Sequence, residues 1–266
     1  YCCSRWSVII STLIHPSALI SNDAILGNNV SVGPYSVIEN NVHIGDDSSI
    51  GNHTTVKAGT TIGKNTRIFH NCSIGEIPQD LKFGGEETTT LIGDNVTIRE
   101  SVTINRGTSA RGCTEIGHNV LLMACTHVAH DCVLGNNVIM ANLTTLGGHV
   151  ELGDWVFLGG GVLVHQFSKV GAHSFIGGGF RIVQDVPPFI LGAGEPLEYS
   201  GINQIGLRRR GFNGDSRKLI KEVYRLYFRS DMNRKDALDK IKKDFNQFDE
   251  IKMIINFIES TNRGII

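Results

Sequence analysis

The sequence predicts a mainly β fold, a three-sided column of short parallel strands followed by a small all-α domain. Three observations predict it: an aliphatic residue recurs every six positions over most of the chain, glycine is abundant, and the apolar spacing becomes helical near the C-terminus. Glycine accounts for 31 of 266 residues, well above the usual frequency of about 7%. Because there is no collagen period, this excess indicates many tight turns.

The six-residue period runs from Ile14 to Ile182. Every sixth residue in this range is Ile, Leu, Val or Met, with exceptions at Asp80, Glu86 and Ala110. Inward residues at i and i−2 indicate short strands separated by turns. Three strands per coil form a prism whose stacked coils bury a continuous aliphatic core. Residues 14–187 are therefore predicted to form a parallel β-helix of hexapeptide repeats.

The period is interrupted twice without losing its phase. Residues 75–91 are predicted to protrude as a loop in place of one coil, and residues 105–115 form a shorter excursion. Loops on a rigid scaffold commonly carry function, so the longer loop is a candidate binding element, although a tolerated insertion is the alternative.

The apolar spacing is helical from about residue 215. Three runs that begin at Asp215, Asn233 and Asp249 place apolar residues three and four positions apart, and the polar residue that begins each run is a plausible helix cap. Residues 188–266 are therefore predicted to be an α-helical domain. Residues 1–13 show no comparable pattern and are left unassigned.

Composition narrows the classes of partner and compartment. Lys and Arg number 25 against 26 Asp and Glu, a formal charge of −1, so no global charge favours nucleic acid or a membrane surface. No apolar run approaches the roughly 20 residues of a membrane span. The six cysteines show no paired spacing, which favours free thiols in a reducing compartment, the cytoplasm, over a disulfide framework.

Four of the ten histidines are predicted to gather on one edge of the prism. One coil is 18 residues, so residues 18 apart lie above one another at about 4.8 Å. His127 and His130 flank the inward Val128 and face outward. Adding 18 to 130 gives Gly148, and adding 18 again gives Gln166. The residues expected on this edge are therefore His127, His130, Gly148, His149, His165 and Gln166. Unrelated exposed histidines are the alternative reading.

Two glycine triplets, residues 159–161 and 177–179, are also 18 apart and stack. The central residues Gly160 and Gly178 then lie on a shallow track without side chains, which suits a linear acyl chain. A simple need for glycine in turns explains only part of each triplet.

The histidine edge has the groups needed for acyl transfer. A neutral His130 can accept a proton from an attacking hydroxyl while a backbone N–H stabilises the oxyanion. Asp131 or His127 is placed to orient and polarise His130. No Ser or Cys is placed as a nucleophile, so direct attack by the acceptor is the simpler mechanism.

The chain resembles the UDP-N-acetylglucosamine O-acyltransferases that begin lipid A biosynthesis. The resemblance covers nearly the whole chain from about residue 14, and it rests on the stretches IHPSA, IPQDLKFGGE, IRESVTINRGT, LLMACTHVAHDC, GGHV, VHQF, QDVPPF and GINQIGLRRRGF. It implies that the β-helix is left-handed, that the enzyme is a homotrimer with sites between neighbouring subunits, and that no cofactor or metal is needed.

The resemblance also implies roles for individual residues. His130 would be the general base, His127 would position the sugar nucleotide, Asp131 would orient the base, and Gly148 would supply the oxyanion N–H. Asp80 and Lys82 would meet the acceptor sugar and phosphates, serving a neighbour's His130. The nucleotide and thioester sites would be completed by His149, His165, Gln166, Asn203 and Arg209.

The implied donor is a 3-hydroxyacyl chain on acyl carrier protein, and the implied acceptor is UDP-N-acetylglucosamine or its 3-amino analogue. Glycine at position 178 implies a long acyl chain. Acyl carrier proteins are acidic, and the concentrated basic patch is formed by Arg208, Arg209, Arg210, Arg217, Lys218, Lys221 and Arg225. We expect this patch to dock the carrier, although a solvated basic face is the alternative.

Three other functions are weighed against this one. A γ-class carbonic anhydrase would hold zinc between outward histidines of the same fold, but it leaves the loop and the helical tail unexplained. The related N-acyltransferase of the same pathway carries a nucleotide-binding domain ahead of its repeats. A purely structural β-helix does not account for the histidine edge.

Overall fold

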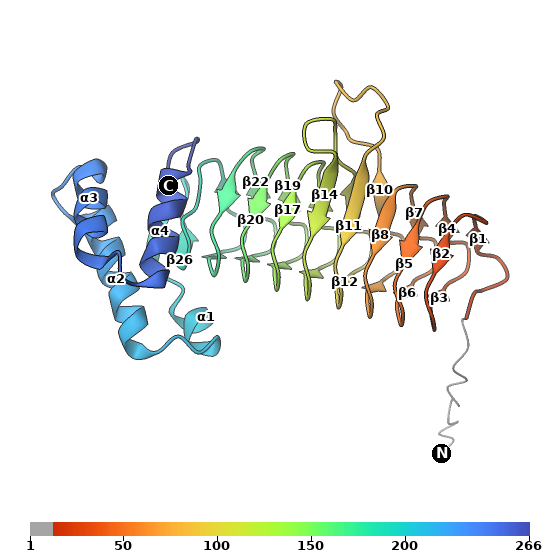
Figure 1. Ribbon diagram of the computed structural model, residues 1–266, viewed down its shortest axis with the longest axis horizontal. Coiled ribbons are helices and arrows are strands. Elements are labelled where there is room, and N and C mark those ends of the chain that lie inside the picture. Colours follow the sequence, from red (N-terminus) through yellow and green to blue (C-terminus); the bar gives the residue numbers. More distant parts are fainter. Residues whose placement is uncertain (1–12) are drawn as a thin grey trace, which may run out of the picture.

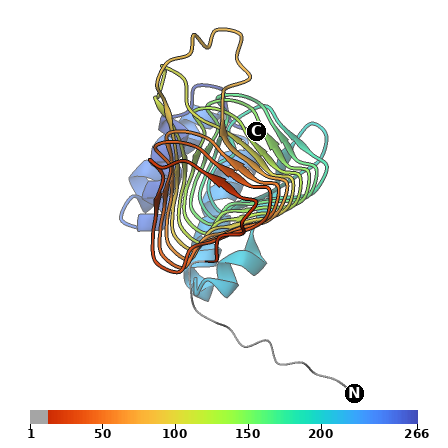
Figure 2. The same cartoon turned by 90° about the vertical axis from the view of Figure 1, so that its right-hand side faces the viewer.

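The structure, a computed structural model, describes residues 13–266, so of the unassigned segment 1–13 only Leu13 is described. Figure 1 shows a long column of strands with two loops protruding from its middle and helices packed at one end. Viewed along the column, the coils superpose as a three-sided prism, and the loops rise from one edge (Figure 2).

Each wall of the prism is one sheet whose strands come from successive coils and run parallel, except that the last strand of the third sheet is antiparallel. The first sheet contains β1 (Leu19–Ile20), β4 (Val37–Ile38), β7 (Thr55–Val56), β10 (Ser73–Glu76), β13 (Thr103–Asn105), β16 (His127–Val128), β19 (Thr145–Leu146), β22 (Leu163–Val164) and β25 (Arg181–Ile182). The second contains β2 (Ile25–Leu26), β5 (His43–Ile44), β8 (Thr60–Ile62), β11 (Thr89–Ile92), β14 (Cys113–Ile116), β17 (Val133–Leu134), β20 (Glu151–Leu152) and β23 (Lys169–Val170). The third contains β3 (Ser31–Val32), β6 (Ser49–Ile50), β9 (Arg67–Ile68), β12 (Thr97–Ile98), β15 (Leu121–Leu122), β18 (Ile139–Met140), β21 (Phe157–Leu158), β24 (Phe175–Ile176), β26 (Ile190–Ala193) and β27 (Glu198–Ile202).

The turns between these walls define three edges. We call the turns between the first and second sheets, at 129–132, 147–150 and 165–168, the histidine edge. The turns between the second and third sheets, at 135–138, 153–156 and 171–174, form the aromatic edge. The turns between the third and first sheets, at 141–144, 159–162 and 177–180, form the glycine edge.

The predicted aliphatic positions form the core of the prism. Val128 and Leu146 are 0% exposed, and the residues two before them, Thr126 and Thr144, are buried as well. Burying an aliphatic side chain of this size contributes roughly 1.5–3 kcal/mol. Repetition of this burial in every coil makes the column a rigid support for the turns at its edges.

The protruding loop is shorter than the predicted range 75–91. Backbone pairing carries β10 on to Glu76 and starts β11 at Thr89, because these residues bond to the neighbouring coils. The loop itself therefore spans 77–88. The pairing offset of 18 residues between Leu19 and Val37 becomes 30 between Arg67 and Thr97, so the insertion is smaller than a coil. A second loop, 106–112, joins β13 to β14.

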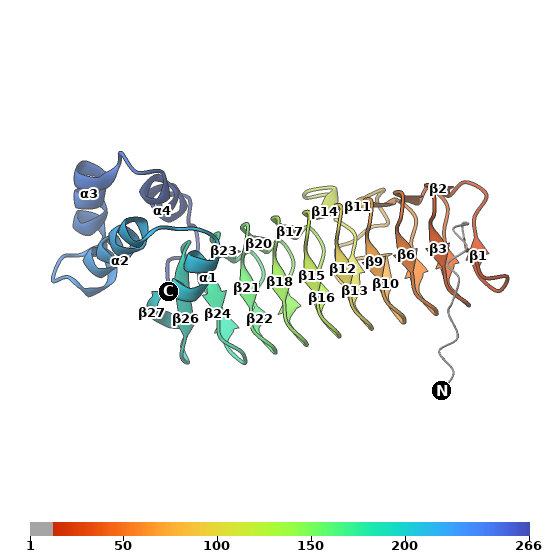
Figure 3. The same ribbon diagram turned by 90° about the horizontal axis from the view of Figure 1, so that it is seen from below.

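The segment 188–266 begins with strands, not with helices. Strand β26 pairs in parallel with β24 and antiparallel with β27, so the third sheet continues past the last hexapeptide. The helices follow as α1 (Gln204–Arg209), α2 (Gly214–Arg229), α3 (Arg234–Phe245) and α4 (Asp249–Glu259). Figure 3 shows α1 lying beside β24 and the other helices beyond the end of the column.

Helix capping follows the prediction at one of the three expected positions. Asn233 caps α3 through the backbone N–H of Asp236, at 2.9 Å. The cap of α2 is Asn213, two residues before the predicted Asp215, which lies inside the helix. Asp249 is the first residue of α4, which has no side-chain cap.

The end of the chain returns to the prism. Asp185 and Ile265 form a parallel β-bridge, and the Asp185 N–H donates to the Gly264 carbonyl at 2.9 Å. Arg234 also holds this tail, donating to the Ile265 carbonyl at 2.8 Å. Within residues 13–266, no helix has the length and apolar character needed to cross a membrane.

Candidate active site

His130 and Asp131 lie together on the histidine edge, in the turn between β16 and β17. The Nδ1 atom of His130 is 2.8 Å from Oδ2 of Asp131, and the His130 side chain is 13% exposed while that of Asp131 is fully buried. The turn puts Asp131 in the left-handed region at φ 60°. The carboxylate meets the Nδ1 side of the imidazole ring.

Asp131 is held as an acceptor by several donors. The Thr108 backbone N–H donates to Oδ1 at 2.9 Å, and its hydroxyl donates to Oδ2 at 2.7 Å. Burial raises the pKa of Asp131, but the hydrogen bonds from Thr108 and His130 outweigh burial, so the pKa lies below its usual range. Asp131 is therefore an ionised carboxylate at neutral pH.

The ionised carboxylate determines which nitrogen of His130 carries the hydrogen. A carboxylate only accepts hydrogen bonds, so Nδ1 of His130 must be the donor and Nε2 of the neutral ring keeps its lone pair. His130 lines a cavity of about 630 Å³. His130 thus has the tautomer and the access that a general base needs.

Gly148 lies directly against the base. A Cβ atom at position 148 would be 2.6 Å from Cε1 and 2.7 Å from Nε2 of His130, so only glycine leaves room for the ring. Among residues 13–266, no backbone or side-chain acceptor bonds to the Gly148 N–H. A free N–H beside Nε2 is the arrangement expected of an oxyanion donor.

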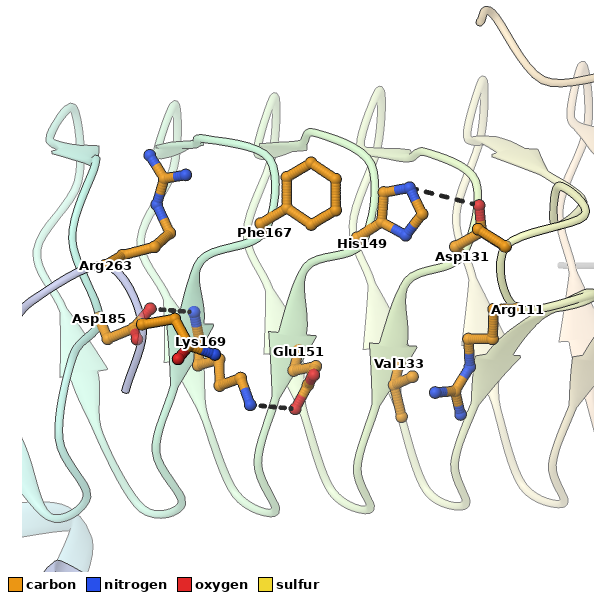
Figure 4. Close-up of a pocket in the computed structure, with 11 residues that line it drawn as sticks. Arg111, Asp131, Val133, His149, Glu151, Phe167, Lys169, Asp185 and Arg263 are labelled. Carbon is orange, nitrogen blue, oxygen red and sulfur yellow. Dashed lines mark hydrogen bonds and ion pairs between the residues drawn. The ribbon is translucent and has the colours of Figure 1, made fainter. Parts of the chain in front are cut away.

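His149 and Phe167 continue the row that starts at Asp131. Figure 4 shows Asp131, His149 and Phe167 side by side on consecutive coils. The His149 ring stacks on Phe167 at 4.4 Å between centroids and meets the His130 ring edge-on at 5.1 Å. Burial lowers the pKa of His149, which keeps this imidazole neutral.

His149 and Phe167 hold a costly backbone conformation. Their φ angles are 61° and 65°, in the left-handed region, which costs about 1–2 kcal/mol for a residue with a Cβ. The same conformation recurs at corner turns along the column, for example at Asn41, Leu143 and Trp155. It therefore belongs to the geometry of the coil and does not single out this site.

His127 faces outward from β16 and lies half-buried. Its Nδ1 is 2.7 Å from the Thr103 hydroxyl. Burial, and then the neighbouring His130, lower the pKa of His127. A neutral, hydrogen-bonded ring here fits the expected role of positioning substrate.

The loop 77–88 brings Asp80 and Lys82 to the same 630 Å³ cavity as His130, His149 and Gln166. The expectation was that Asp80 and Lys82 serve the base of a neighbouring subunit. In the structure they line the cavity of their own chain's His130, because both loops rise from the histidine edge.

Glu86 joins the two loops. Its Oε1 accepts from the Ser109 N–H at 3.0 Å, and its Oε2 accepts from the Gly84 N–H at 2.8 Å. Thr108, beside Ser109, is bonded to Asp131. The carboxylate that orients the base therefore also anchors the loop 106–112, which Glu86 in turn joins to the loop that carries Asp80 and Lys82.

His165 and Gln166 have different surroundings. Gln166 lines the cavity with His130, as predicted from the 18-residue column. His165 is exposed on the same edge, but its Nδ1 lies 3.2 Å from Arg263 and it does not line that cavity.

The structure does not bring Gly160 and Gly178 to the base. They lie exposed on the glycine edge, separated from His130 by the first sheet. A Cβ at Gly178 would approach the Gly160 carbonyl oxygen at 3.0 Å, whereas one at Gly161 or Gly179 would meet nothing within 4 Å. The predicted strip without side chains is present, on another edge of the prism.

Asn203, Arg209 and Arg210 lie at the aromatic edge, around a second cavity of about 790 Å³ that contains Trp155 and His173. The Asn203 amide donates to the His173 carbonyl at 2.9 Å and caps α1 through Gly206. Its second N–H and its second oxygen lone pair remain for the expected contact with a nucleotide.

Arg210 packs against the aromatic edge. Its guanidinium lies 5.1 Å from the Trp155 ring, and its Nη1 is 3.4 Å from Nδ1 of His173. Burial, followed by the charge of Arg210, lowers the pKa of His173 to about 4. Arg209 is exposed beside this cavity.

The sequence did not reveal three residues of the site: Thr108, Glu86 and Phe167. Thr108 and Glu86 lie in the inserted loops, where the 18-residue arithmetic does not apply. Phe167 was adjacent to the predicted column, and its position one coil after His149 is the signal that would have found it.

Family comparisons cover both parts of the chain. Residues 185–266 match the family described as UDP N-acetylglucosamine O-acyltransferase, domain 2. Residues 113–148 match the bacterial transferase hexapeptide family of six repeats, and residues 8–111 match the GMPPB C-terminal domain.

Curated relatives match over almost their full length. An acyl-(acyl-carrier-protein)–UDP-N-acetylglucosamine O-acyltransferase of Thiobacillus denitrificans is 43% identical, over 95% of this chain and 98% of its own. One of Aliivibrio fischeri is 45% identical, over 95% and 97%.

Solved structures agree with these relatives. A UDP-N-acetylglucosamine acyltransferase from Bacteroides fragilis is 46% identical with a TM-score of 0.94, over 96% of this chain and 100% of its own. An Arabidopsis enzyme of the same name is 33% identical with a TM-score of 0.80, over 95% and 99%. The predicted left-handed parallel β-helix of hexapeptide repeats with C-terminal helices is thereby confirmed. The chain belongs to the acyl-(acyl-carrier-protein)–UDP-N-acetylglucosamine O-acyltransferase family, the acyltransferases of lipid A biosynthesis.

Proposed function

We propose that the protein transfers a 3-hydroxyacyl chain from acyl carrier protein to the 3-hydroxyl of UDP-N-acetylglucosamine, with His130 as the general base. The observation that carries this proposal is the His130–Asp131 pair, which leaves Nε2 free next to Gly148, whose N–H bonds to no acceptor in residues 13–266. The names of the relatives supply the donor and acceptor classes.

The reaction proceeds by direct attack. Nε2 of His130 accepts the proton of the 3-hydroxyl as its oxygen bonds to the thioester carbonyl carbon. The carbonyl oxygen becomes an oxyanion, which the Gly148 N–H stabilises. As the C–S bond breaks, the His130 imidazolium returns the proton to the departing thiolate. Asp131 stabilises the imidazolium between these two proton transfers.

The loop and the histidine edge hold the acceptor. Asp80, Lys82, His127 and Gln166 surround or adjoin the cavity that contains Nε2. Lys82 supplies a cation for the diphosphate, and the neutral His127 ring supplies hydrogen bonding to the sugar.

The enzyme acts as a homotrimer in this proposal. The predicted site residues lie on three different edges of one prism: His130 on one, Gly160 and Gly178 on another, and Asn203 and Arg209 on the third. Because a rigid prism cannot fold its edges together, neighbouring copies must complete each other's sites.

The acidic carrier docks on the basic patch of α1 and α2, whose Arg209, Lys218, Lys221 and Arg225 are exposed. The strip at Gly160 and Gly178 accepts a long acyl chain of tetradecanoyl length or more. The reaction is the first step of lipid A biosynthesis and takes place in the cytoplasm, where Cys72, Cys113, Cys125 and Cys132 remain free thiols.

The test is transfer of a 3-hydroxyacyl group from acyl carrier protein to UDP-N-acetylglucosamine by the wild type and by His130→Ala. We expect activity to fall by about 10²-fold or more in the variant with its oligomeric state unchanged. Full activity in His130→Ala places the base elsewhere. Inactivity of the wild type, also with the 3-amino acceptor, contradicts the proposed function. When donors of different length compete, a preference for a decanoyl over a tetradecanoyl chain contradicts the proposed binding of a long chain at Gly160 and Gly178.

A further inference from the structure

A third cavity, of about 570 Å³, adjoins the histidine edge on the outer face of the second sheet. It is reached along the row Asp131, His149 and Phe167, and Figure 4 shows the Arg263 guanidinium next in that row. Arg263 comes from the C-terminal tail, far from the hexapeptide repeats in sequence. Neither the acyl-transfer proposal nor the sequence pattern gives this arginine a role.

Within residues 13–266, the other cations of this cavity are ion-paired, and its buried carboxylates are hydrogen-bonded to neutral donors. Asp131 bonds to Thr108, Lys169 lies 3.5 Å from Glu151, and Arg111 lies 3.2 Å from Glu115. Asp185 accepts from the Lys169 N–H at 2.8 Å and from Thr261. Within residues 13–266, Arg263 contacts no carboxylate. It is the cation of this cavity wall that is left to bind an anion.

Arg263 is held in place without being neutralised. Its Nε and Nη2 donate to the Val183 carbonyl at 3.4 and 3.3 Å, and Nη2 lies 3.2 Å from Nδ1 of His165. The adjacent Gly264 is fixed to Asp185 by a backbone hydrogen bond of 2.9 Å. The backbone that carries the guanidinium is therefore preorganised, which lowers the entropic cost of binding a ligand.

We propose that Arg263 binds a phosphate group of a substrate. The inference rests on the proposed acyl transfer, and it deepens it by assigning a cationic binding residue outside the resembling motifs. The arginine fork matches phosphate oxygens in two parallel hydrogen bonds. Its location three coil spacings along the row from Asp131, roughly 15 Å, lies beyond the reacting atoms, at a distance that an extended substrate can span.

Two substrates carry such a phosphate. The acceptor has a diphosphate between its sugar and its nucleoside, and the donor has a phosphate where its pantetheine arm joins the carrier. Both present the same chemistry to Arg263, so kinetics must distinguish them.

The experiment compares the wild type with Arg263→Met and Arg263→Lys. KM is measured for UDP-N-acetylglucosamine and for the acyl carrier separately, and UDP alone is titrated calorimetrically. Loss of a charge-assisted hydrogen bond raises KM for the substrate concerned by about 10- to 100-fold, with kcat nearly unchanged. Arg263→Lys retains the charge but loses the two parallel hydrogen bonds of the guanidinium, so its KM lies between those of the wild type and Arg263→Met.

The outcomes are distinct. A higher KM for UDP-N-acetylglucosamine together with weaker UDP binding assigns the acceptor's diphosphate, and a higher KM for the carrier alone assigns the arm's phosphate. Two unchanged KM values, or a fall in kcat alone with a lower Tm, overturn the proposal. Arg111→Met is the matched control, because Arg111 lies on the same cavity but is paired with Glu115, and its KM values should not change.

Failure of the acyl-transfer function is recognised separately. If the wild type transfers no acyl group, the kinetic arms are lost, but UDP titration still reports on phosphate binding. Equal affinity of wild type and Arg263→Met both for UDP and for the phosphopantetheine-bearing carrier, in such a protein, overturns the binding role as well.

Discussion

Oδ2 of the buried Asp131 lies 2.8 Å from Nδ1 of His130 and accepts from the Thr108 hydroxyl at 2.7 Å, so one oxygen serves both the base and a neighbouring loop. This double use links the proton chemistry of the site to the position of its loops. It also makes Asp131 the residue whose replacement is most informative.

Asp131→Asn is expected to reverse the tautomer of His130. The amide oxygen can still accept from the Thr108 N–H, but the amide nitrogen then donates to Nδ1, so the hydrogen of the ring moves to Nε2. We expect kcat to fall by about 10²-fold or more with a folded protein. Steady-state kinetics and thermal unfolding check this, and a variant with normal kcat contradicts the assigned tautomer.

Gly148→Ala is expected to displace the base. The new Cβ would lie 2.6 Å from Cε1 of His130, so the ring must move. A shift of about 1 Å in a catalytic group can cost about 10²-fold in rate, and we expect kcat to fall by that order. Gly214→Ala is the control, since a Cβ there meets nothing within 4 Å. Equal kcat values in the two variants would rule out close packing at the base.

Glu86→Ala is expected to loosen the acceptor loop without affecting the base. Losing the bonds to Ser109 and Gly84 should raise the KM for UDP-N-acetylglucosamine by roughly threefold to tenfold. The neighbouring Glu87 is exposed and makes no hydrogen bond or ion pair with any residue from 13 to 266, so Glu87→Ala is the matched control. An identical KM in both variants would show that the link between the loops does not position substrate.

Arg209→Glu is expected to weaken docking of the acidic carrier. Replacing attraction by repulsion should raise the KM for the acyl carrier by roughly threefold to tenfold at low salt, and the difference should shrink as salt rises. Arg67→Glu, at an exposed position on the column, controls for net charge. An unchanged KM at low salt for Arg209→Glu excludes this arginine from docking. Arg210 is less suitable than Arg209 as the site of this charge reversal, because its guanidinium also packs on Trp155.

His173 is expected to make stability depend on pH. Burial and the Arg210 charge lower its pKa from 6.5 to about 4, so between these values the unfolded chain binds more protons than the folded one. The free energy of unfolding is therefore highest above about pH 6.5. It falls as the pH drops toward about 4, by an amount of the order of 3 kcal/mol.

His173→Phe keeps the stack on Trp155 and Phe189 and removes the titrating group. The variant should therefore lose less stability than the wild type between pH 7 and pH 4.5, as measured by urea unfolding at both values. Equal losses of unfolding free energy in the two proteins would show that His173 is not the group responsible.

The fold was predictable because burial repeats with the coil. Val128, Leu146 and Val164 are each one coil apart and all buried. The six-residue period therefore predicts the strands, and the 18-residue coil predicts which residues share a wall or an edge. The same arithmetic placed His130, Gly148 and Gln166 on one edge.

Contacts made where the 18-residue period is interrupted, or where the period has ended, could not be predicted from the sequence. Thr108 bonds to Asp131 across 23 residues because the second loop intervenes, and no period indicates that contact. Arg263 reaches the prism because the helical domain turns its tail back to Asp185, which depends on tertiary packing. The strands β26 and β27 were missed because they follow the last hexapeptide and pair by a different register.

The separation of the site residues onto different edges has a genetic consequence. Under the proposed assembly, a damaged histidine edge and a damaged aromatic edge in different copies leave one interface with two intact halves. Co-expression of the inactive His130→Ala with the docking-impaired Arg209→Glu would then form mixed trimers in which one site has both residues intact and regains the wild-type KM for the carrier. Such intragenic complementation cannot arise in an enzyme whose site is built from one chain.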